Sequence, residues 1–339
     1  MIEKFVVSRD DSTYEAWPDL EKITGDKLIC VFTECTHHGN RDNSRIVYSI
    51  SEDRGRTWQA KIPLTSYTNK DYHWNCPRIV KLKDNRLVII CDKTGNEQRT
   101  QVFLWFSHNN GDTWEGPIGT RITGIVPDKL VELSSGRWLI GTHTRVRRYL
   151  RQAVYISDDA GNTWQGPVTI ARRRGLHLCE GSIMELEDES LVCFMRENSH
   201  KGRDCYKAIS KDHGMTWNGP YRMPIPGCHR PVAGYLQSEA ILMTYRFIQG
   251  GMRGWGHATQ NFFAALFDDT TALAVDRDNQ SVRIMPIDYD RSLQADLGYS
   301  GWIQFDDGEI YIVTYLVDDA PKGQIRGYVL HEDDFYLIP

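Results

Sequence analysis

The sequence has no apolar run close to the roughly 20 residues that a transmembrane helix needs, which excludes a helical membrane protein. It also has no long basic run, and its net charge is −5, so nothing favours nucleic acid or an anionic membrane as a partner. Residues 1–5 lack the features of a signal peptide, and we therefore expect a cytoplasmic location. Convincing helical periodicity is missing throughout, which argues against a mainly helical fold.

Cysteine is present, but not in the patterns that bind metals. None of the eight cysteines belongs to a C-x-x-C pair, and no pair of candidate ligands has the usual zinc spacing. Several cysteines lie inside strand-like apolar runs. We therefore expect buried free thiols in a reducing compartment, and neither a metal nor a cofactor.

What the sequence does contain is an eight-residue phrase that occurs four times. The pattern is Ser-x-Asp/Asn-x-Gly-x-Thr-Trp, and the copies begin at Ser51, Ser107, Ser157 and Ser210. The Asp or Asn side chain can bond the backbone two residues on, and the glycine supplies a positive φ in the turn. The tryptophan can pack beneath that turn. Copies 50 to 56 residues apart indicate a repeat architecture.

A second repeat, a strand followed by a turn and a strand, occurs six times. Each copy places one apolar anchor before a polar turn and another five residues later. The first anchors are Ile23, Leu82, Leu133, Leu186, Leu236 and Phe305, and the second are Leu28, Leu87, Trp138, Leu191, Ile241 and Ile310. Six hairpins, four of them extended by the eight-residue phrase, predict an all-β fold. The predicted architecture is a six-bladed β-propeller that uses residues 1–339 as one domain.

The edge between the first and last blades of a propeller must be covered. Residues 4–9 are strand-like, and within segment 1–13 they are predicted to add a strand to the last blade beside residues 325–330. Residues 250–260 and 276–297 are longer and irregular, and we expect them to form loops over the binding face. Trp255, in the first of these segments, is a candidate for stacking on a sugar.

Overlaying the six copies aligns two rows of residues. Five residues past the second anchor lie Thr33, Asp92, His143, Arg196, Arg246 and Tyr315. Six residues before the first anchor lie Trp17, Cys76, Pro127, Glu180, Arg230 and Tyr299, with an offset of one residue allowed in the third blade. Converging charges are costly unless they are paired or used, so the two rows predict a binding site near one mouth of the channel.

The eight-residue phrase is the Asp-box, and the chain resembles the sialidase superfamily of six-bladed propellers with Asp-boxes, also called BNR repeats. Glu180, Arg196, the fourth box, Arg246 and Tyr299 follow one another as the corresponding residues do in bacterial exo-sialidases. The resemblance implies retaining hydrolysis with Tyr299 as the nucleophile and Glu180 as the base that activates it. It also implies that Arg196 and Arg246 bind the carboxylate of an acidic sugar.

The resemblance further implies an aspartic acid as general acid in the loop after the second strand of the first blade. Asp42 occupies the matching place, nine residues before the first box. His37 and His38 share the loop and are alternative proton-transfer groups. Asp42 could also form an ordinary Asx-turn.

The sequence departs from the family pattern at the start of the first blade. The family's F-R-I-P motif is replaced here, and Ala16 stands where the first arginine of the carboxylate-binding triad is expected. Either Arg78 or Arg230 substitutes for that arginine, or the pocket has been refitted for another sugar. The additional polar residues Asp92, Asp128, Lys129 and His143 favour a refitted pocket.

These observations together predict an enzyme, an exo-acting sialidase-type hydrolase that removes terminal sialic acid or a related ulosonic acid. One alternative is a hydrolase or lyase that acts on a uronic or neutral glycan, using Glu180 with Asp42 or Asp92, or Tyr299 with His143. The other is a propeller that binds a sugar without catalysis. A glycan is the expected partner in each case, and the sequence leaves the oligomeric state open.

Overall fold

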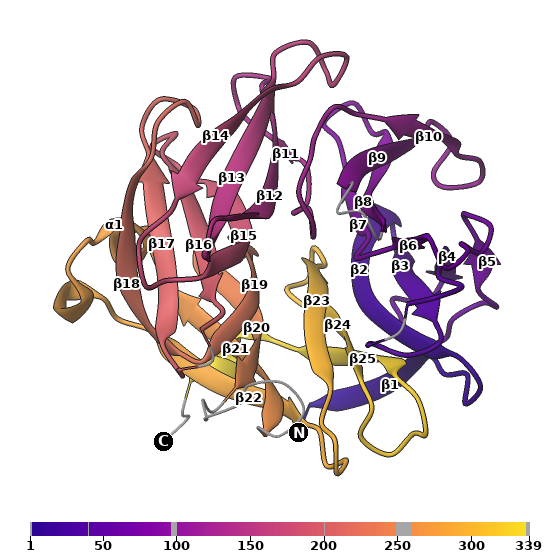
Figure 1. Ribbon diagram of the computed structural model, residues 1–339. Helices are drawn as coiled ribbons and strands as arrows, with labels where there is room; N and C mark the ends of the chain where they lie inside the picture. The colour runs from indigo at the N-terminus through magenta and orange to yellow at the C-terminus, as the bar shows by residue number, and fades with distance from the viewer. Residues whose placement is uncertain (1, 40, 96–99, 200, 249–258, 337–339) are drawn as a thin grey trace. The chain divides into compact units, whose positions relative to one another are not determined.

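The protein is described by a computed structural model that covers residues 2–39, 41–95, 100–199, 201–248 and 259–336. The chain divides into two compact units, of which the first is Met1–Val126 with Asp290–Pro339 and the second is Pro127–Tyr289. Each unit contains three small antiparallel sheets (Figure 1), so the six sheets of a six-bladed β-propeller are present as the repeats predict. That residues 1–339 fold as one domain stays a prediction.

The first unit contains the first, second and sixth sheets. The first sheet consists of β2 (Tyr14–Thr24), β3 (Lys27–Cys35), β4 (Arg45–Ser51) and β5 (Ile62–Pro63). The second consists of β6 (Tyr72–Trp74), β7 (Arg78–Lys81), β8 (Leu87–Gly95), β9 (Thr100–Ser107) and β10 (Glu115–Gly119). The sixth has the order β1 (Glu3–Ser8), β25 (Gln324–Leu330), β24 (Ile310–Leu316) and β23 (Leu297–Gln304).

The second unit contains the third, fourth and fifth sheets, each with its strands in chain order. The third consists of β11 (Val131–Glu132), β12 (Trp138–Val146), β13 (Tyr149–Ser157) and β14 (Gln165–Ala171). The fourth consists of β15 (Leu178–Glu185), β16 (Leu191–Glu197), β17 (Asp204–Ser210) and β18 (Asn218–Pro226). The fifth consists of β19 (Cys228–Tyr235), β20 (Ile241–Ile248), β21 (Gln260–Phe267) and β22 (Arg283–Tyr289).

Helices are few and short among the described residues. They are α1 (Asp269–Leu273) and the 3₁₀ helices η1 (Arg277–Asn279) and η2 (Glu332–Phe335). A helix of about 20 residues is needed to cross a bilayer, and no described helix approaches that length.

The hairpin turns form at the predicted anchors. In five of the six hairpins the backbone N–H of the first anchor donates to the carbonyl four residues later, as from Leu82 to Arg86 and from Leu186 to Ser190, both at 2.8 Å. All twelve anchors are buried. Burial of such a side chain contributes about 1.5–3 kcal/mol, so the turns are held by the cores on either side of each sheet.

Three of the four boxed turns share one hydrogen-bond pattern, and the second differs because the side-chain amide of Asn109 donates to the Thr113 hydroxyl at 2.9 Å. In the first, Asp53 accepts from the backbone N–H and the hydroxyl of Thr57 at 2.8 and 2.6 Å, and the indole of Trp58 donates to the Gly55 carbonyl at 3.1 Å. The Ser51 hydroxyl accepts from the Gly55 N–H at 2.8 Å. The four box glycines have φ between 82° and 89°, the left-handed region in which a side chain is strained. The Asp-box is therefore a local turn closed by hydrogen bonds within its own eight residues.

The amino-terminal strand is confirmed at its predicted place. β1 pairs antiparallel with β25, with Glu3 opposite Val329 and Lys4 opposite Tyr328 (Figure 1). Val7 of β1 is buried in the core of this sheet. The N-terminal segment therefore covers the edge that β25 would otherwise expose.

Deleting residues 1–10 is expected to lower the melting temperature by about 5–10 °C, because an unpaired edge and a lost apolar contact cost roughly 3 kcal/mol. Differential scanning calorimetry against a deletion of residues 1–2 measures the effect. A melting temperature equal to that of the shorter deletion would contradict the role of β1.

Of the two segments predicted to be loops, one contains a strand and the other lies mostly outside the described residues. Residues 276–297 are not irregular throughout, because they contain β22, which pairs with β21 as the outer strand of the fifth sheet. Pro286 and a register shift opposite Phe262 and Phe263 interrupt the regular pairing of this strand. Most of the segment 250–260, with Trp255, lies outside the described residues. All eight cysteines are buried free thiols, as expected.

Candidate active site

A β-bulge with left-handed backbone marks the start of the inner strand in four sheets. The residues concerned are Trp17, Glu180, Arg230 and Tyr299, with φ of 57°, 48°, 52° and 56°. In each strand the pairing register shifts at this point. A bulge re-aims a side chain, and left-handed backbone is uncommon outside glycine. The row predicted from the repeat therefore shares one local geometry.

The third sheet shows the one-residue offset that the repeat allowed. The left-handed residue there is Val126, with φ of 51°, and not Pro127. Cys76 of the second sheet does not have left-handed backbone. These two positions present no ionisable side chain other than a buried thiol, so the charged members of the row, Glu180 and Arg230, come from two sheets and the tyrosine from a third.

The strongest feature of the second unit is a buried ion pair between Glu180 on β15 and Arg196 on β16. One guanidinium nitrogen, Nη1, lies 2.9 and 2.7 Å from the two carboxylate oxygens. The other, Nη2, donates to the side-chain oxygen of Asn198 at 2.7 Å. Both charged residues are buried, so their mutual attraction is weakly screened.

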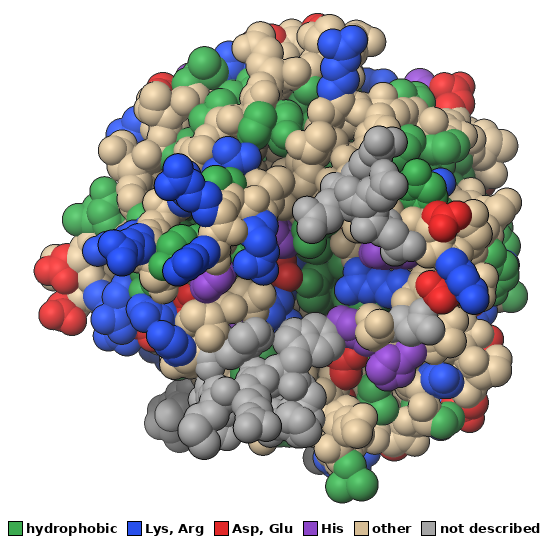
Figure 2. Space-filling view, viewed as in Figure 1, with side chains coloured by type: hydrophobic (Ala, Val, Ile, Leu, Met, Phe, Trp, Pro, Cys, Tyr) green, Lys and Arg blue, Asp and Glu red, His purple; other side chains and the backbone are tan. Residues whose placement is uncertain are grey.

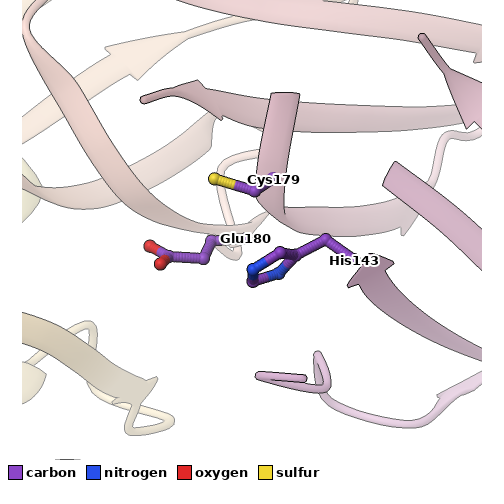
Figure 3. A group of neighbouring side chains, drawn as sticks. All are labelled: His143, Cys179 and Glu180. Atoms are coloured by element: carbon purple, nitrogen blue, oxygen red, sulfur yellow. The ribbon is translucent and has the colours of Figure 1, made fainter. Parts of the chain in front are cut away.

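The electrostatics around Glu180 favour its charged form. Burial opposes ionisation, but the charges of Arg196, His143 and Arg246 outweigh it and hold the pKa of Glu180 at about 2. Burial also lowers the pKa of His143 to about 4, against the opposing effect of Glu180. Figure 3 shows the His143 imidazole pointing toward the Glu180 side chain. At neutral pH the site thus holds an ionised carboxylate, a neutral imidazole and two guanidinium groups.

Two clusters of described residues have the composition of a cation site, but their contacts argue against one. His143, Cys179 and Glu180 have ligand atoms within 4.8 Å of one another (Figure 3). Burial raises the pKa of the Cys179 thiol well above its usual value, and Arg196 occupies the Glu180 oxygens. The other cluster, Asp10, Glu15 and Glu34, surrounds the ammonium group of Lys61. A cation is already supplied in each case by the protein.

Arg78 and Arg230 are both fully buried and both hold backbone carbonyls. In the first unit, Arg78 donates to the carbonyls of Pro18 and Ser300 at 3.1 and 2.9 Å. In the second, Arg230 donates to the carbonyls of Pro127 and Gly181 at 3.3 and 3.4 Å. These contacts tie neighbouring inner strands together. Substitution by either residue for the missing arginine stays a prediction.

Tyr299 of β23 lies in an aromatic group of the first unit. Its ring centroid is 6.4 Å from that of Tyr315, and Tyr315 is 6.1 Å from Trp17. The Tyr315 hydroxyl donates to Asp296 at 3.0 Å. Tyr14 also donates to Asp296. An aromatic neighbour of the predicted nucleophile therefore binds a carboxylate that the repeat did not reveal.

His38 belongs to the same group. Its Nδ1 lies 2.7 Å from the second oxygen of Asp296, and its ring packs edge-on against Trp17 at 5.0 Å. An imidazole held by a carboxylate is oriented for proton transfer. His37 is exposed and accepts from the Gly39 N–H at 3.1 Å, so the two histidines of the loop differ in environment.

Asp42 is half-buried, and its backbone carbonyl accepts a hydrogen bond from Thr36 at 3.0 Å. Its negative charge raises the pKa of His73, although burial and Arg41 leave that pKa lowered to about 4. The neighbouring Arg41 stacks over Trp17, with its guanidinium carbon 4.4 Å from the ring centroid. This loop therefore places the Asp42 carboxylate and the Arg41 guanidinium group in the same unit as Tyr299.

Asp92, at the equivalent position of β8, is fully buried in a hydrogen-bonded setting. It accepts from Asn75 at 3.1 Å, from Thr94 at 2.8 Å and from the Val126 N–H at 3.0 Å. Burial raises its pKa despite these bonds. The contacts hold the strand end in place, and a role for Asp92 toward a substrate stays a prediction.

Sequence reasoning missed Asp296, Arg41 and Asn198. Asp296 lies in a segment flagged as a loop but outside the repeat, so no overlay could select it. Its position three residues before Tyr299 was the available signal. Asn198 follows Arg196 by two residues, the spacing that places both side chains on one face of an extended strand.

Comparisons with known proteins agree with this architecture. A family model described as a BNR repeat-like domain matches residues 26–245. A sialidase from Clostridium perfringens is 25% identical over 209 residues, covering 52% of this chain and 52% of that protein. The chain therefore spans about half the length of this curated relative.

Solved structures extend the likeness to nearly the whole chain. A Dyadobacter fermentans protein of unknown function matches with a TM-score of 0.79 and 19% identity, covering 97% of this chain and 98% of that one. The Trypanosoma rangeli sialidase in complex with sialic acid matches with a TM-score of 0.68 and 14% identity, covering 96% and 58%. At these identities the structures show the fold. The family match, which spans well over half of the chain, shows that this protein belongs to the BNR repeat-like domain family, within the sialidase superfamily.

Proposed function

We propose that the protein is an exo-acting, retaining glycoside hydrolase that removes a terminal sugar bearing a carboxylate, namely sialic acid or a related ulosonic acid. The observation that carries the proposal is the buried Glu180–Arg196 pair, with Arg246 and neutral His143 beside it. Two guanidinium groups in a buried site suit an anionic ligand, because Arg binds carboxylates through two parallel hydrogen bonds.

A tyrosine nucleophile fits such a ligand better than a carboxylate does. Tyr299 has the same left-handed bulge backbone as Glu180, so the two side chains start from equivalent positions in their sheets. A neutral phenol avoids the repulsion that a second carboxylate would exert on the sugar's own carboxylate. Glu180 and Tyr299 belong to different units, so their pairing is part of the proposal.

In the first chemical step, the Tyr299 hydroxyl gives its proton to Glu180 as its oxygen bonds to the anomeric carbon. The glycosidic bond breaks with its electron pair on the leaving oxygen, which takes a proton from the general acid. Water then attacks the anomeric carbon and gives its proton to that acid, now deprotonated. The Tyr299 oxygen departs and takes its proton back from Glu180.

The low pKa of Glu180 implies that its strength as a base depends on whether a substrate is bound. With a pKa of about 2, its carboxylate is a weak base at neutral pH while Arg196 holds it. A substrate carboxylate that binds Arg196 and Arg246 competes with Glu180 for the Arg196 guanidinium group. The loss of this contact raises the pKa of Glu180 and strengthens it as a base only when an anionic sugar is bound.

Arg41 is the residue that we propose in place of the missing triad arginine. Its guanidinium group stacks over Trp17, the residue that follows Ala16. Its Nε donates to the His38 carbonyl at 3.3 Å, and one terminal nitrogen donates to the Asn75 side chain. A guanidinium group held in this way beside Trp17, next to Ala16, could bind the substrate carboxylate from a loop, where the family uses an arginine on a strand.

The proton for the leaving group is proposed to come from the same loop. Asp42 has the sequence position that the family uses, and His38 has the clearer structural support through Asp296. In both cases the donor shares the first unit with Tyr299.

Fluorophore release from a panel of 4-methylumbelliferyl glycosides tests the proposal. The panel contains N-acetylneuraminate, other ulosonic acids, uronates and neutral sugars. Turnover of an ulosonic acid with retained anomeric configuration in the first product supports the proposal. Arg41→Ala should then act mainly by raising KM. A comparison of the turnover of Asp42→Asn with that of His38→Gln identifies the proton donor.

Other outcomes would replace the proposal. Turnover of only a uronate, with ultraviolet absorbance from a new C=C bond, would indicate a lyase that uses Tyr299 and His143. Release from only a neutral sugar would indicate a refitted hydrolase. Saturable binding of the acidic sugars without release would indicate a sugar-binding propeller.

A further inference from the structure

One face of the second unit carries a concentration of arginines drawn from three separate stretches of the sequence. We call it the arginine surface and define it by Arg147, Arg148, Arg172, Arg173, Arg174 and Arg203, all of them exposed. They come from the turn between β12 and β13, the loop between β14 and β15, and the loop before β17. Figure 2 shows basic side chains gathered on the left of the view, over the sheets of this unit.

The arginine surface is hollowed. Two hollows of about 420 and 470 Å³ share Arg174 in their lining. The first is also lined by Arg173, Arg203 and Arg222, and the second by Arg147, Arg148 and Arg172. Volumes of this size fall in the range of ligand pockets. The shape therefore suits a chain laid across two adjacent subsites.

Its charge is mostly uncompensated within the part of the chain that the structure describes. Arg203 lies 3.7 Å from Glu197, whereas the other five members have no carboxylate within ion-pair distance among those residues. Six guanidinium groups placed together repel one another, and a positively lined hollow attracts anions from solution. A protein with a net charge of −5 has placed them on one face of this unit. This asymmetry points to an anionic partner.

The arginine surface also adjoins the Glu180–Arg196 pair inside the same unit. The ring of Tyr149, which lines one hollow, lies 5.5 Å from the ring of His177. The His177 backbone N–H donates to Glu197 at 2.8 Å, and Glu197 is the chain neighbour of Arg196. Tyrosine and histidine rings offer flat faces on which a sugar can pack. The three loops that carry the arginines also join the ends of β12, β15 and β16 on which His143, Glu180 and Arg196 lie, so the arginine surface and the proposed sugar site are at the same strand ends.

We propose that the arginine surface binds an anionic polysaccharide, a chain that carries a carboxylate or sulfate on successive sugars and whose terminal sugar is the substrate. This proposal rests on the proposed function, which fixes the end of the polysaccharide that enters the sugar site. It adds the class of polymer from which that sugar is removed. A glycan fits better than nucleic acid, because the surface lies at the same strand ends as the proposed sugar site and the remainder of the protein is net acidic.

Equilibrium binding to polysialic acid tests the proposal, with neutral dextran and a 20-nucleotide single-stranded DNA as comparison ligands. The test variant is Arg172→Ala/Arg173→Ala/Arg174→Ala. The matched control is Lys70→Ala/Lys83→Ala/Arg121→Ala, which removes three exposed cations of the first unit and changes the net charge equally. Isothermal titration calorimetry at several salt concentrations gives the affinities, and circular dichroism checks that both variants fold.

The wild type and the control variant are expected to bind polysialic acid and not dextran, with an affinity that falls as salt rises. The test variant is expected to bind at least tenfold more weakly and with a smaller salt slope, since each lost contact removes one released counterion. Equal weakening in both variants, no binding by the wild type, or tighter binding to the DNA would each overturn the proposal. Because binding needs no turnover, failure of the proposed hydrolysis would show separately in the glycoside panel.

Discussion

Tyr299→Phe is expected to lower turnover of an ulosonic acid glycoside by about three orders of magnitude or more, because the change removes the only atom that can form the covalent intermediate. The loss should appear in kcat and not in KM, since the aromatic ring is retained. Steady-state kinetics on the responsive 4-methylumbelliferyl substrate measure it.

The fold should survive this substitution. Tyr299 packs through its ring against Tyr315, and phenylalanine preserves that contact. Tyr311→Phe is a matched control in the same sheet, because the Tyr311 hydroxyl donates to the Gly55 carbonyl of the first Asp-box at 2.7 Å. The control should lose about 1 kcal/mol of stability and keep its turnover. Full activity in Tyr299→Phe, or an equal loss in both variants, would exclude Tyr299 as the nucleophile.

The parts of the fold that could be predicted are those encoded locally. Each Asp-box closes through bonds between residues four apart or fewer, such as Asp53 to Thr57, so eight letters suffice to specify it. The apolar anchors on either side of each hairpin turn could be predicted because a tight turn between two buried residues has a fixed length. Glu180, Arg230 and Tyr299 followed from the same repeat, since equivalent positions in equivalent sheets take equivalent backbone.

The parts that could not be predicted depend on contacts between distant segments. Asp296 gains its importance from Tyr14, His38 and Tyr315, and no spacing relates it to those residues. β22 was mistaken for loop because Pro286 breaks its alternation. The arginine surface is assembled from three turns, and the short runs at residues 147–148 and 172–174 do not by themselves show that they meet Arg203 on one face.

The ion pair in the second unit leads to the second large effect. Arg196→Met is expected to destabilise the protein by about 3–5 kcal/mol at neutral pH, because it leaves the Glu180 carboxylate buried without its main partner. Methionine retains much of the volume and cannot form the two contacts of 2.7 and 2.9 Å. Urea unfolding, with the slope checked against wild type, measures the change in the free energy of unfolding.

A double-variant cycle separates the charge effect from packing. Glu180→Gln/Arg196→Met has no unpaired buried charge, so it should be more stable than Arg196→Met alone by 2 kcal/mol or more, as an order of magnitude. Glu180→Gln alone leaves Arg196 with its bond to Asn198 and should cost less than Arg196→Met. If the losses of the two single variants simply added in the double variant, the pair would not be coupled and its role as a charge pair would be refuted.

The pH dependence gives the same pair a test with a defined sign. In the wild type, Glu180 has a folded-state pKa of about 2 against an ordinary value of 4.5, so it stabilises the fold above pH 4.5. That contribution, about 3 kcal/mol for a shift of this size, is lost as the pH falls from 4.5 toward 2. In Arg196→Met, burial of Glu180 dominates and raises its pKa, so protonation favours the folded state. The stability difference between wild type and variant should therefore shrink as the pH falls through this range, whereas a constant difference would mean that Glu180 does not carry the charge that Arg196 compensates.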